Sequence, residues 1–281
     1  MATRKSPIII AIAAIALVAL WNPSIYQHAI SPLLLLLSSP NAASPPHGYT
    51  TEIISLDPLL IYIHGFLSPP ETAALLAAAD GRFVPSEIYR DGRMVRNPKR
   101  TSLSAPLPPD HPAVRRVLAR AHSFLGPVGE DDEMGVPQLV HYDPGQHYGL
   151  HHDWLREPQR AFDGSPRAFN RAVSFFAVLD DKCEGGETWF PFVEPVVRAE
   201  GESPLWRTHE DGGLAFRPVA GNALFWVNLF PNGTGDTRTV HAGMPITRGT
   251  KTAMNIWPRR YRWDDGVGGQ GKEGTGEEVP S

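Results

Sequence analysis

The sequence has one cysteine, Cys183, in 281 residues. A single cysteine forms no intrachain disulfide, and it excludes a zinc site built from paired cysteines. Net charge is also small, because 26 Lys and Arg against 30 Asp and Glu leave a formal charge of -4. This balance lacks the basic footprint of a nucleic-acid-binding surface, so we expect no nucleic-acid partner. The chain shows no internal repeats.

Long apolar runs are confined to the amino terminus. Arg4 and Lys5 precede an apolar run over 8–21, which is shorter than the ~20 residues that cross a bilayer comfortably. A second apolar patch covers 30–37. Two interpretations stay open, an uncleaved signal-anchor or a signal peptide cleaved near 42–44. Because the basic residues precede the apolar run, both place the bulk of the chain in the lumen or outside.

Two helices are predicted before the middle of the chain. Ser68 and Glu71 form a capping-box pattern with prolines between them, which predicts a helix that ends at Gly81. Apolar residues at helical spacing predict a second helix over 110–125. The segment 87–109 between them is polar, rich in Arg and Pro and without periodicity, and we expect a mobile loop there.

The rest of the pattern is typical of strands. The 28 prolines and 26 glycines imply many turns. Short strands are predicted over 61–63, 138–142, 171–179, 188–190, 223–229, 237–241 and 251–258, with a less regular insertion at 194–213. Many short strands after two helices predict a mostly β fold with flanking α-helices, a jelly-roll barrel. Cys183 stands before a Gly-Gly turn, and we interpret it as structural.

The most informative stretch is 138–153, QLVHYDPGQHYGLHHD. In an extended segment His151 and Asp153 share one face. One imidazole and one carboxylate are two of the three ligands of a facial triad, which holds iron(II) with open positions. A third ligand is predicted at His241, at a strand end before a turn. Lys251 begins the last strand, from which it could reach beside the metal and pair with an anionic ligand, and Trp257 lies on the same side.

These motifs resemble the catalytic domain of prolyl 4-hydroxylases, which are iron(II)- and 2-oxoglutarate-dependent dioxygenases with a double-stranded β-helix fold. The resemblance extends over about 51–260. The matching residues are Tyr142, Gly145-Gln146, Tyr148, His151-x-Asp153, Gly185-Gly186-Glu187-Thr188, Gly221-Asn222-Ala223-Leu224-Phe225, His241-Ala242-Gly243 and Lys251.

The resemblance implies a role for each matching site residue. His151, Asp153 and His241 would hold Fe(2+), and Lys251 would pair with 2-oxoglutarate, helped by Tyr142 and Thr188. Tyr148 and Arg171 match positions near the peptide substrate, and Trp257 matches one that shapes the metal pocket. The resemblance also implies molecular oxygen as co-substrate, L-ascorbate as cofactor, succinate and CO2 as co-products, and a proline-containing peptide or protein as substrate.

We therefore expect a dioxygenase that hydroxylates peptidyl proline. The expected segments are an anchor or signal at 1–40, a linker at 41–50, the catalytic domain at 51–262 with its core at 134–260, and a disordered tail at 263–281. The expected location is the endoplasmic reticulum membrane, single-pass with a lumenal catalytic domain, or secretion if the signal is cleaved. Two alternatives stay open, a hydroxylase of a free amino acid or small metabolite and an inactive binding module. The single cysteine and the lack of a separate upstream peptide-binding domain differ from animal collagen-type enzymes.

Overall fold

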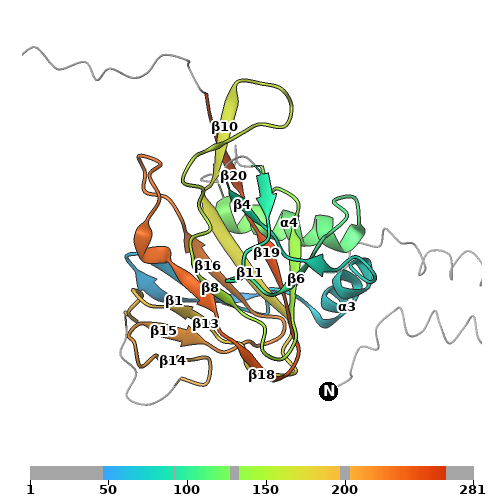
Figure 1. Ribbon diagram of the computed structural model, residues 1–281, viewed down its shortest axis with the longest axis vertical. Coiled ribbons are helices and arrows are strands. Elements are labelled where there is room, and N and C mark those ends of the chain that lie inside the picture. Colours follow the sequence, from blue (N-terminus) through green and yellow to red (C-terminus); the bar gives the residue numbers. More distant parts are fainter. Residues whose placement is uncertain (1–46, 91–92, 127–132, 197–202, 264–281) are drawn as a thin grey trace, which may run out of the picture. The chain divides into compact units, whose positions relative to one another are not determined.

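The computed structural model describes residues 47–90, 93–126, 133–196 and 203–263. The expected anchor at 1–40 lies outside the described residues, as does most of the expected linker and tail. Within the part of the chain that is described, no helix is long and apolar enough to cross a membrane. Figure 1 shows the described residues as a barrel of strands with two helices on one side.

The first layer is an eight-stranded antiparallel sheet. Its order is β1 (Thr50–Leu56), β2 (Leu59–His64), β16 (Ala223–Val227), β11 (Val173–Asp180), β19 (Lys251–Ile256), β7 (Gln138–Tyr142), β6 (Leu103–Pro106) and β3 (Val84–Pro85). The central strands β11 and β19 are buried along almost their whole length. A continuous apolar run is what a strand covered on both faces requires.

The second layer is a five-stranded sheet. Its order is β14 (Trp206–Thr208), β15 (Leu214–Phe216), β13 (Thr188–Phe190), β17 (His241–Gly243) and β8 (Tyr148–His151). A separate two-stranded sheet consists of β12 (Cys183–Gly185), which precedes β13 along the chain, and β18 (Ile246–Gly249), which follows β17. Phe176 and Leu224 of the first sheet share one apolar core with Phe190 and Phe216 of the second. The two facing sheets confirm the predicted jelly-roll barrel.

The helices α3 (Pro69–Ala78) and α4 (Pro112–Leu125) cover the outer face of the first sheet. Leu75 and Val117 belong to a second apolar core together with Phe175 of β11. Odd-numbered residues of β11 therefore face the helices and even-numbered residues face the barrel interior. The predicted capping box is confirmed, because the Ser68 hydroxyl accepts from the Glu71 amide and the Glu71 carboxylate accepts from the Ser68 amide.

A buried ion pair joins the two helices. The Arg120 guanidinium donates to both carboxylate oxygens of Glu71 at 2.8 and 3.1 Å, and to the Phe66 carbonyl at 2.8 Å. The Glu71 side chain is only 7% exposed. Burial would raise the pKa of this carboxyl, but the hydrogen bonds from Arg120 and Ser68 and the Arg120 charge outweigh it and lower the pKa.

Arg120→Met should destabilise the fold, because the buried Glu71 carboxylate loses both guanidinium hydrogen bonds and keeps only the longer ion pair with Arg116 at 3.9 Å. We expect a loss of about 3 kcal/mol in the free energy of unfolding, measured by urea titration. The double variant Glu71→Leu/Arg120→Met should recover part of this loss. Because the folded pKa of Glu71 lies below its unfolded value, the stability it supplies is full above about pH 4.3 and is lost as the pH falls through the folded pKa. An unchanged urea midpoint in Arg120→Met would contradict the proposed contribution.

Three sequence predictions need correction. The expectation that 87–109 is a loop is wrong, because this segment contains the paired strands β4 (Ile88–Arg90) and β5 (Arg93–Val95) and also the strand β6. A strand over 237–239 is wrong, because those residues form a short 3-10 turn, η2 (Thr237–Thr239). The strand predicted to start at Arg171 starts at Val173. Arg171 instead ends β10 (Arg167–Arg171), the middle of a small sheet with β9 (Gln159–Arg160) and β20 (Arg259–Trp263).

Candidate active site

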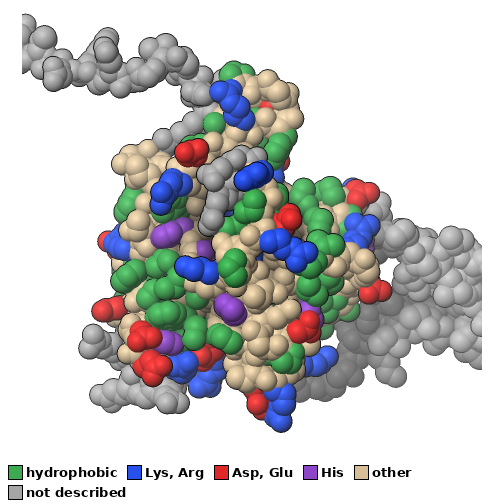
Figure 2. All heavy atoms as spheres, viewed as in Figure 1, with side chains coloured by type: hydrophobic (Ala, Val, Ile, Leu, Met, Phe, Trp, Pro, Cys, Tyr) green, Lys and Arg blue, Asp and Glu red, His purple; other side chains and the backbone are tan. Residues whose placement is uncertain are grey.

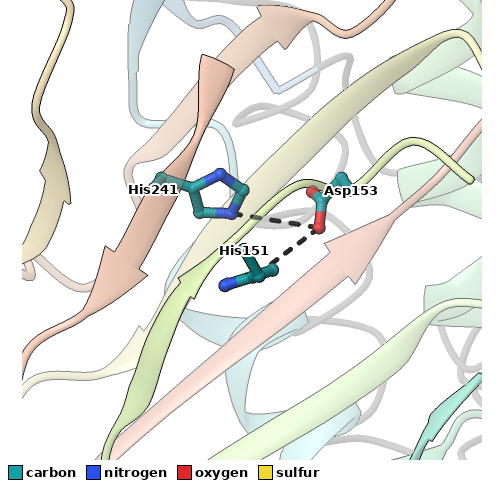
Figure 3. Close-up of side chains that lie close together, drawn as sticks. All are labelled: His151, Asp153 and His241. Carbon is teal, nitrogen blue, oxygen red and sulfur yellow. Dashed lines mark ion pairs between the residues drawn. The ribbon is translucent and has the colours of Figure 1, made fainter. Parts of the chain in front are cut away.

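The neighbouring strands β8 and β17 of the second sheet bring the three predicted metal ligands together. His151 ends β8 and lies opposite His241, the first residue of the neighbouring strand β17. Asp153 follows two residues after His151 and lies on the same side, as the extended spacing predicts. Figure 3 shows the three side chains pointing toward one another. The Asp153 Oδ1 atom lies 3.7 Å from His151 Nε2 and 3.9 Å from His241 Nε2.

Backbone hydrogen bonds orient both imidazoles. His151 Nδ1 lies 2.9 Å from the Gly149 carbonyl, and His241 Nδ1 lies 3.0 Å from the Thr239 carbonyl. A carbonyl accepts only, so the proton is on Nδ1 in each ring and the Nε2 lone pair is directed at the shared space. Burial lowers the pKa of both histidines, and the nearby His241 lowers that of His151 further. Both rings are therefore neutral at pH 7, as metal ligation requires.

The two oxygens of the Asp153 carboxylate make different contacts. Its Oδ2 atom accepts from the Ser174 hydroxyl at 2.6 Å and from the Trp257 indole at 2.9 Å. Burial would raise the pKa of this carboxyl, but His241, His151 and Arg171 and the Ser174 hydrogen bond lower it to about 2. Oδ1 is left facing the two imidazoles. Two neutral imidazoles and one carboxylate, with ligand atoms within 4.8 Å of one another, match the facial-triad set of iron(II) oxygenases.

A pocket that opens to solvent surrounds the triad. It is lined by Arg100, Val140, Tyr142, Tyr148, His151, Asp153, Phe176, Thr188, His241, Gly243, Asn255 and Trp257. The lining combines apolar walls with a few polar groups, as small-ligand sites do. Seven of the nine predicted site residues line this pocket, namely Tyr142, Tyr148, His151, Asp153, Thr188, His241 and Trp257.

Lys251 lies behind this lining. It starts β19 opposite Tyr142 of β7 and is 1% exposed. Its ammonium donates to the Gly186 carbonyl at 2.6 Å and lies 5.1 Å from the ring centroid of Phe176. Burial lowers the pKa of this ammonium to about 8. An ammonium has three donors, so the contact with Gly186 leaves protons for an anion.

The residues predicted near the substrate flank the triad. The Tyr148 ring stacks on His151, with ring centroids 3.5 Å apart. The Arg171 guanidinium lies 3.9 Å from the centroid of the Trp257 indole and donates to the Asp153 backbone carbonyl at 3.2 Å. The sequence therefore predicted side chains that the structure brings together, although it did not predict that Arg171 contacts Asp153.

Sequence reasoning missed several residues of the site. Arg100 lines the pocket with its guanidinium 4.8 Å from the Tyr148 centroid, whereas the sequence suggested only that it belongs to a loop that could close over the substrate. Asn255 lines the pocket on β19, and Ser174 holds Asp153. Ser174 is a polar residue in a largely apolar strand, a signal that could have found it, whereas Asn255 shares its strand with the polar Lys251 and Thr252. Asn228, which contacts Ser174, carries no such signal because it follows the end of its strand.

A second group of histidine and carboxylates is explained by a turn. His209, Glu210 and Asp211 are consecutive. His209 Nδ1 accepts from the Asp211 amide at 3.1 Å, and its ring stacks on Trp189. Because these contacts already occupy Nδ1 and one ring face of His209, this group differs from the triad of His151, Asp153 and His241.

Comparisons with known proteins agree with this chemistry. Residues 137–259 match the family model of the 2OG-Fe(II) oxygenase superfamily. "Probable prolyl 4-hydroxylase 9" of Arabidopsis thaliana is 29% identical over 236 residues, covering 78% of this chain and 77% of the relative. "Prolyl 4-hydroxylase subunit alpha-2" of Gallus gallus is 33% identical over 149 residues, covering 53% of this chain but 23% of the relative.

A solved structure supports the fold. The crystal structure of the viral collagen prolyl hydroxylase vCPH from Paramecium Bursaria Chlorella virus-1, a 2OG complex, superposes with a TM-score of 0.51. The two are 23% identical, and the match covers 71% of this chain and 95% of the other. The chain therefore contains a 2OG-Fe(II) oxygenase domain and is a homologue of the prolyl 4-hydroxylases.

Proposed function

We propose that this chain hydroxylates a proline within a peptide, as an iron(II)- and 2-oxoglutarate-dependent prolyl 4-hydroxylase. In the balanced reaction, a ring C–H bond becomes C–OH, and 2-oxoglutarate loses CO2 to become succinate. One atom of O2 enters each product. The observation that carries the proposal is the convergence of His151, Asp153 and His241 in a pocket beside a buried lysine.

The triad fits the metal of the family. His151 and His241 would ligate through Nε2 and Asp153 through Oδ1, because these are the atoms that other hydrogen bonds leave free to converge. Iron(II) supplies the activation of oxygen when it is bound. The residues around it keep both imidazoles in one tautomer and hold the carboxylate in place.

Lys251, Tyr142 and Thr188 would bind the distal carboxylate of 2-oxoglutarate. Tyr142 and Thr188 line the pocket, and Lys251 pairs across the strands with Tyr142. Burial raises the pKa of the Tyr142 hydroxyl to about 12, so this group stays a neutral donor. A carboxylate near Lys251 would favour the charged ammonium and compensate for its desolvation.

The mouth of the pocket suits an extended peptide. Tyr148 and Trp257 offer aromatic surface beside the triad, and Arg100 and Arg171 lie against those two rings. Acidic and basic side chains are interspersed on the face in Figure 2, without a large field of one sign. A proline-rich peptide in a polyproline II conformation is already stiff and loses little entropy when it binds on such a surface.

The test is turnover with a panel of substrates. The full chain is incubated with iron(II), 2-oxoglutarate, ascorbate and either proline-rich peptides or free proline, and the products are weighed by mass spectrometry. We expect one oxygen atom per modified residue in the peptides. Turnover restricted to free amino acids would contradict the peptide assignment and leave the dioxygenase chemistry in place.

Tyr148→Ala separates peptide binding from co-substrate chemistry. The ring lines the pocket and stacks on His151, so its loss should weaken use of the peptide. Decarboxylation of 2-oxoglutarate without peptide should fall less. A matched variant, Tyr148→Phe, keeps the stacking and should lose less than Tyr148→Ala. Equal losses in both activities would assign Tyr148 to the metal site instead.

We also propose that the segment 1–40 anchors the chain in the endoplasmic reticulum membrane with the catalytic domain in the lumen. The support is the order of Arg4, Lys5 and the apolar run over 8–21. An anchored chain stays with membranes during alkaline carbonate washing and is protected from protease until detergent is added. A soluble product that begins near Ser44 would support signal cleavage and secretion.

A further inference from the structure

A buried polar relay stands behind Asp153, on the side away from the two histidines. It consists of Ser174 on β11 and Asn228 just after the neighbouring strand β16. Ser174 is 1% exposed and Asn228 is 0% exposed. We propose that Ser174 and Asn228 are positioning residues that hold Asp153 as a one-oxygen metal ligand. This inference rests on the proposed function of the triad as the iron site.

The direction of each hydrogen bond in the relay follows from its chemistry. The Asn228 Nδ2 group donates to Ser174 Oγ at 2.8 Å, and the Ser174 hydroxyl donates its only proton to Asp153 Oδ2 at 2.6 Å. An amide nitrogen cannot accept, so Asn228 fixes the rotation of the hydroxyl and aims its proton at the carboxylate. The Trp257 indole donates to the same oxygen at 2.9 Å.

The consequence concerns the number of open positions at the metal. Two donors occupy Oδ2, and only Oδ1 is directed at the imidazoles. If both oxygens turned toward the metal, the carboxylate would take a further position that 2-oxoglutarate and oxygen need. The two donors therefore favour single-oxygen ligation before any ion or co-substrate arrives. A ligand that is already oriented also binds metal more tightly.

Asn228 also contacts the segment that orients His241. Its backbone carbonyl accepts from the Asp236 amide at 2.9 Å. The Asp236 carboxylate caps the turn η2 by accepting from the Arg238 amide, and the Thr239 carbonyl in that turn accepts from His241 Nδ1. Asn228 thus contacts both Ser174, which holds Asp153, and Asp236, which caps the turn that orients His241.

Ser174→Ala tests the relay without changing a metal ligand. The probe is cobalt(II), added to the purified full chain without 2-oxoglutarate or peptide, so the readout is independent of hydroxylation. We expect the cobalt(II) affinity to fall about 10- to 100-fold, as for other changes to groups that orient metal ligands. We also expect the visible cobalt spectrum to change, because that spectrum reports coordination number. Ser174→Thr keeps the hydroxyl and should restore both.

Two further variants decide whether the effect belongs to the relay. In Thr252→Ala the lost group is another buried hydroxyl of the same sheet, bonded to His141 at 2.8 Å, and the cobalt(II) affinity should stay unchanged. In the double variant Ser174→Ala/Asn228→Ala the affinity should fall no further than in Ser174→Ala, because one connected path is already broken.

Unchanged affinity and spectrum in Ser174→Ala would overturn the inference, and so would an equal loss in Thr252→Ala. These results leave the proposed function intact as long as His241→Ala abolishes cobalt(II) binding. A wild-type chain that binds no cobalt(II) would instead overturn both.

Discussion

His241→Ala is expected to abolish iron-dependent turnover while the barrel stays folded. His241 is one of the three side chains proposed to hold iron, and its ring is directed at Asp153 and His151 from the start of β17. Loss of a ligand should lower iron affinity by more than the roughly 10- to 100-fold that follows loss of an orienting group. His151→Ala and Asp153→Ala should behave alike. Iron binding by titration and turnover of 2-oxoglutarate are the measurements.

A matched histidine variant shows whether the loss of iron binding in His241→Ala is specific to the triad. His209 is buried in the other group of histidine and carboxylates, and His209→Gln should bind iron as the wild type does. Circular dichroism and the thermal midpoint should show that each variant is folded. Full activity in His241→Ala would show that the third ligand is a different residue.

Lys251→Met should chiefly raise the requirement for 2-oxoglutarate. Methionine keeps the apolar stem of the side chain and removes only the charge, so the barrel interior stays filled. A buried carboxylate that loses its cationic partner costs ~3 kcal/mol or more, which is roughly a 100-fold rise in the Kd of 2-oxoglutarate. Lys251→Arg should be intermediate, because a guanidinium is larger and planar. The exposed control Lys182→Ala, with its side chain 85% exposed, should bind as the wild type does.

The same lysine predicts a pH dependence of co-substrate binding. Because burial places the pKa of the Lys251 ammonium at about 8 in the chain without co-substrate, the charged form is lost as the pH rises above that value. The bound carboxylate favours the ammonium, so the affinity for 2-oxoglutarate should fall by up to about tenfold per pH unit in this range. Lys251→Arg should show no such fall, because its guanidinium stays protonated. An affinity that is unchanged by pH, or by Lys251→Met, would remove this residue from the site.

Local patterns were enough to predict much of the fold and two of the side chains that converge at the candidate metal site. His151 and Asp153 are separated by one residue in an extended segment, so backbone geometry alone places them on one face. Lys251 at the start of β19 and Trp257 just after its end lie on the same side for the same reason. The helix that follows Ser68 was readable because its capping box is a local hydrogen-bond pattern.

Contacts between distant segments were not readable from the sequence. The strand β6 is four residues long and ends in proline, and it exists because it pairs with β7 rather than because of its own pattern. Arg100 reaches the pocket through that same arrangement. Ser174 and Asn228 are 54 positions apart and meet only because β11 and β16 are neighbours in the sheet.

The fate of oxygen tests the central claim most directly. The full chain is incubated under oxygen-18 gas with iron(II), 2-oxoglutarate, ascorbate and a proline-rich peptide, and both products are weighed. The account predicts one heavy oxygen atom in each hydroxylated proline, one in succinate, and equal amounts of the two products. The account would be contradicted if succinate formed while the peptide gained no oxygen-18, or if the hydroxyl oxygen came only from water.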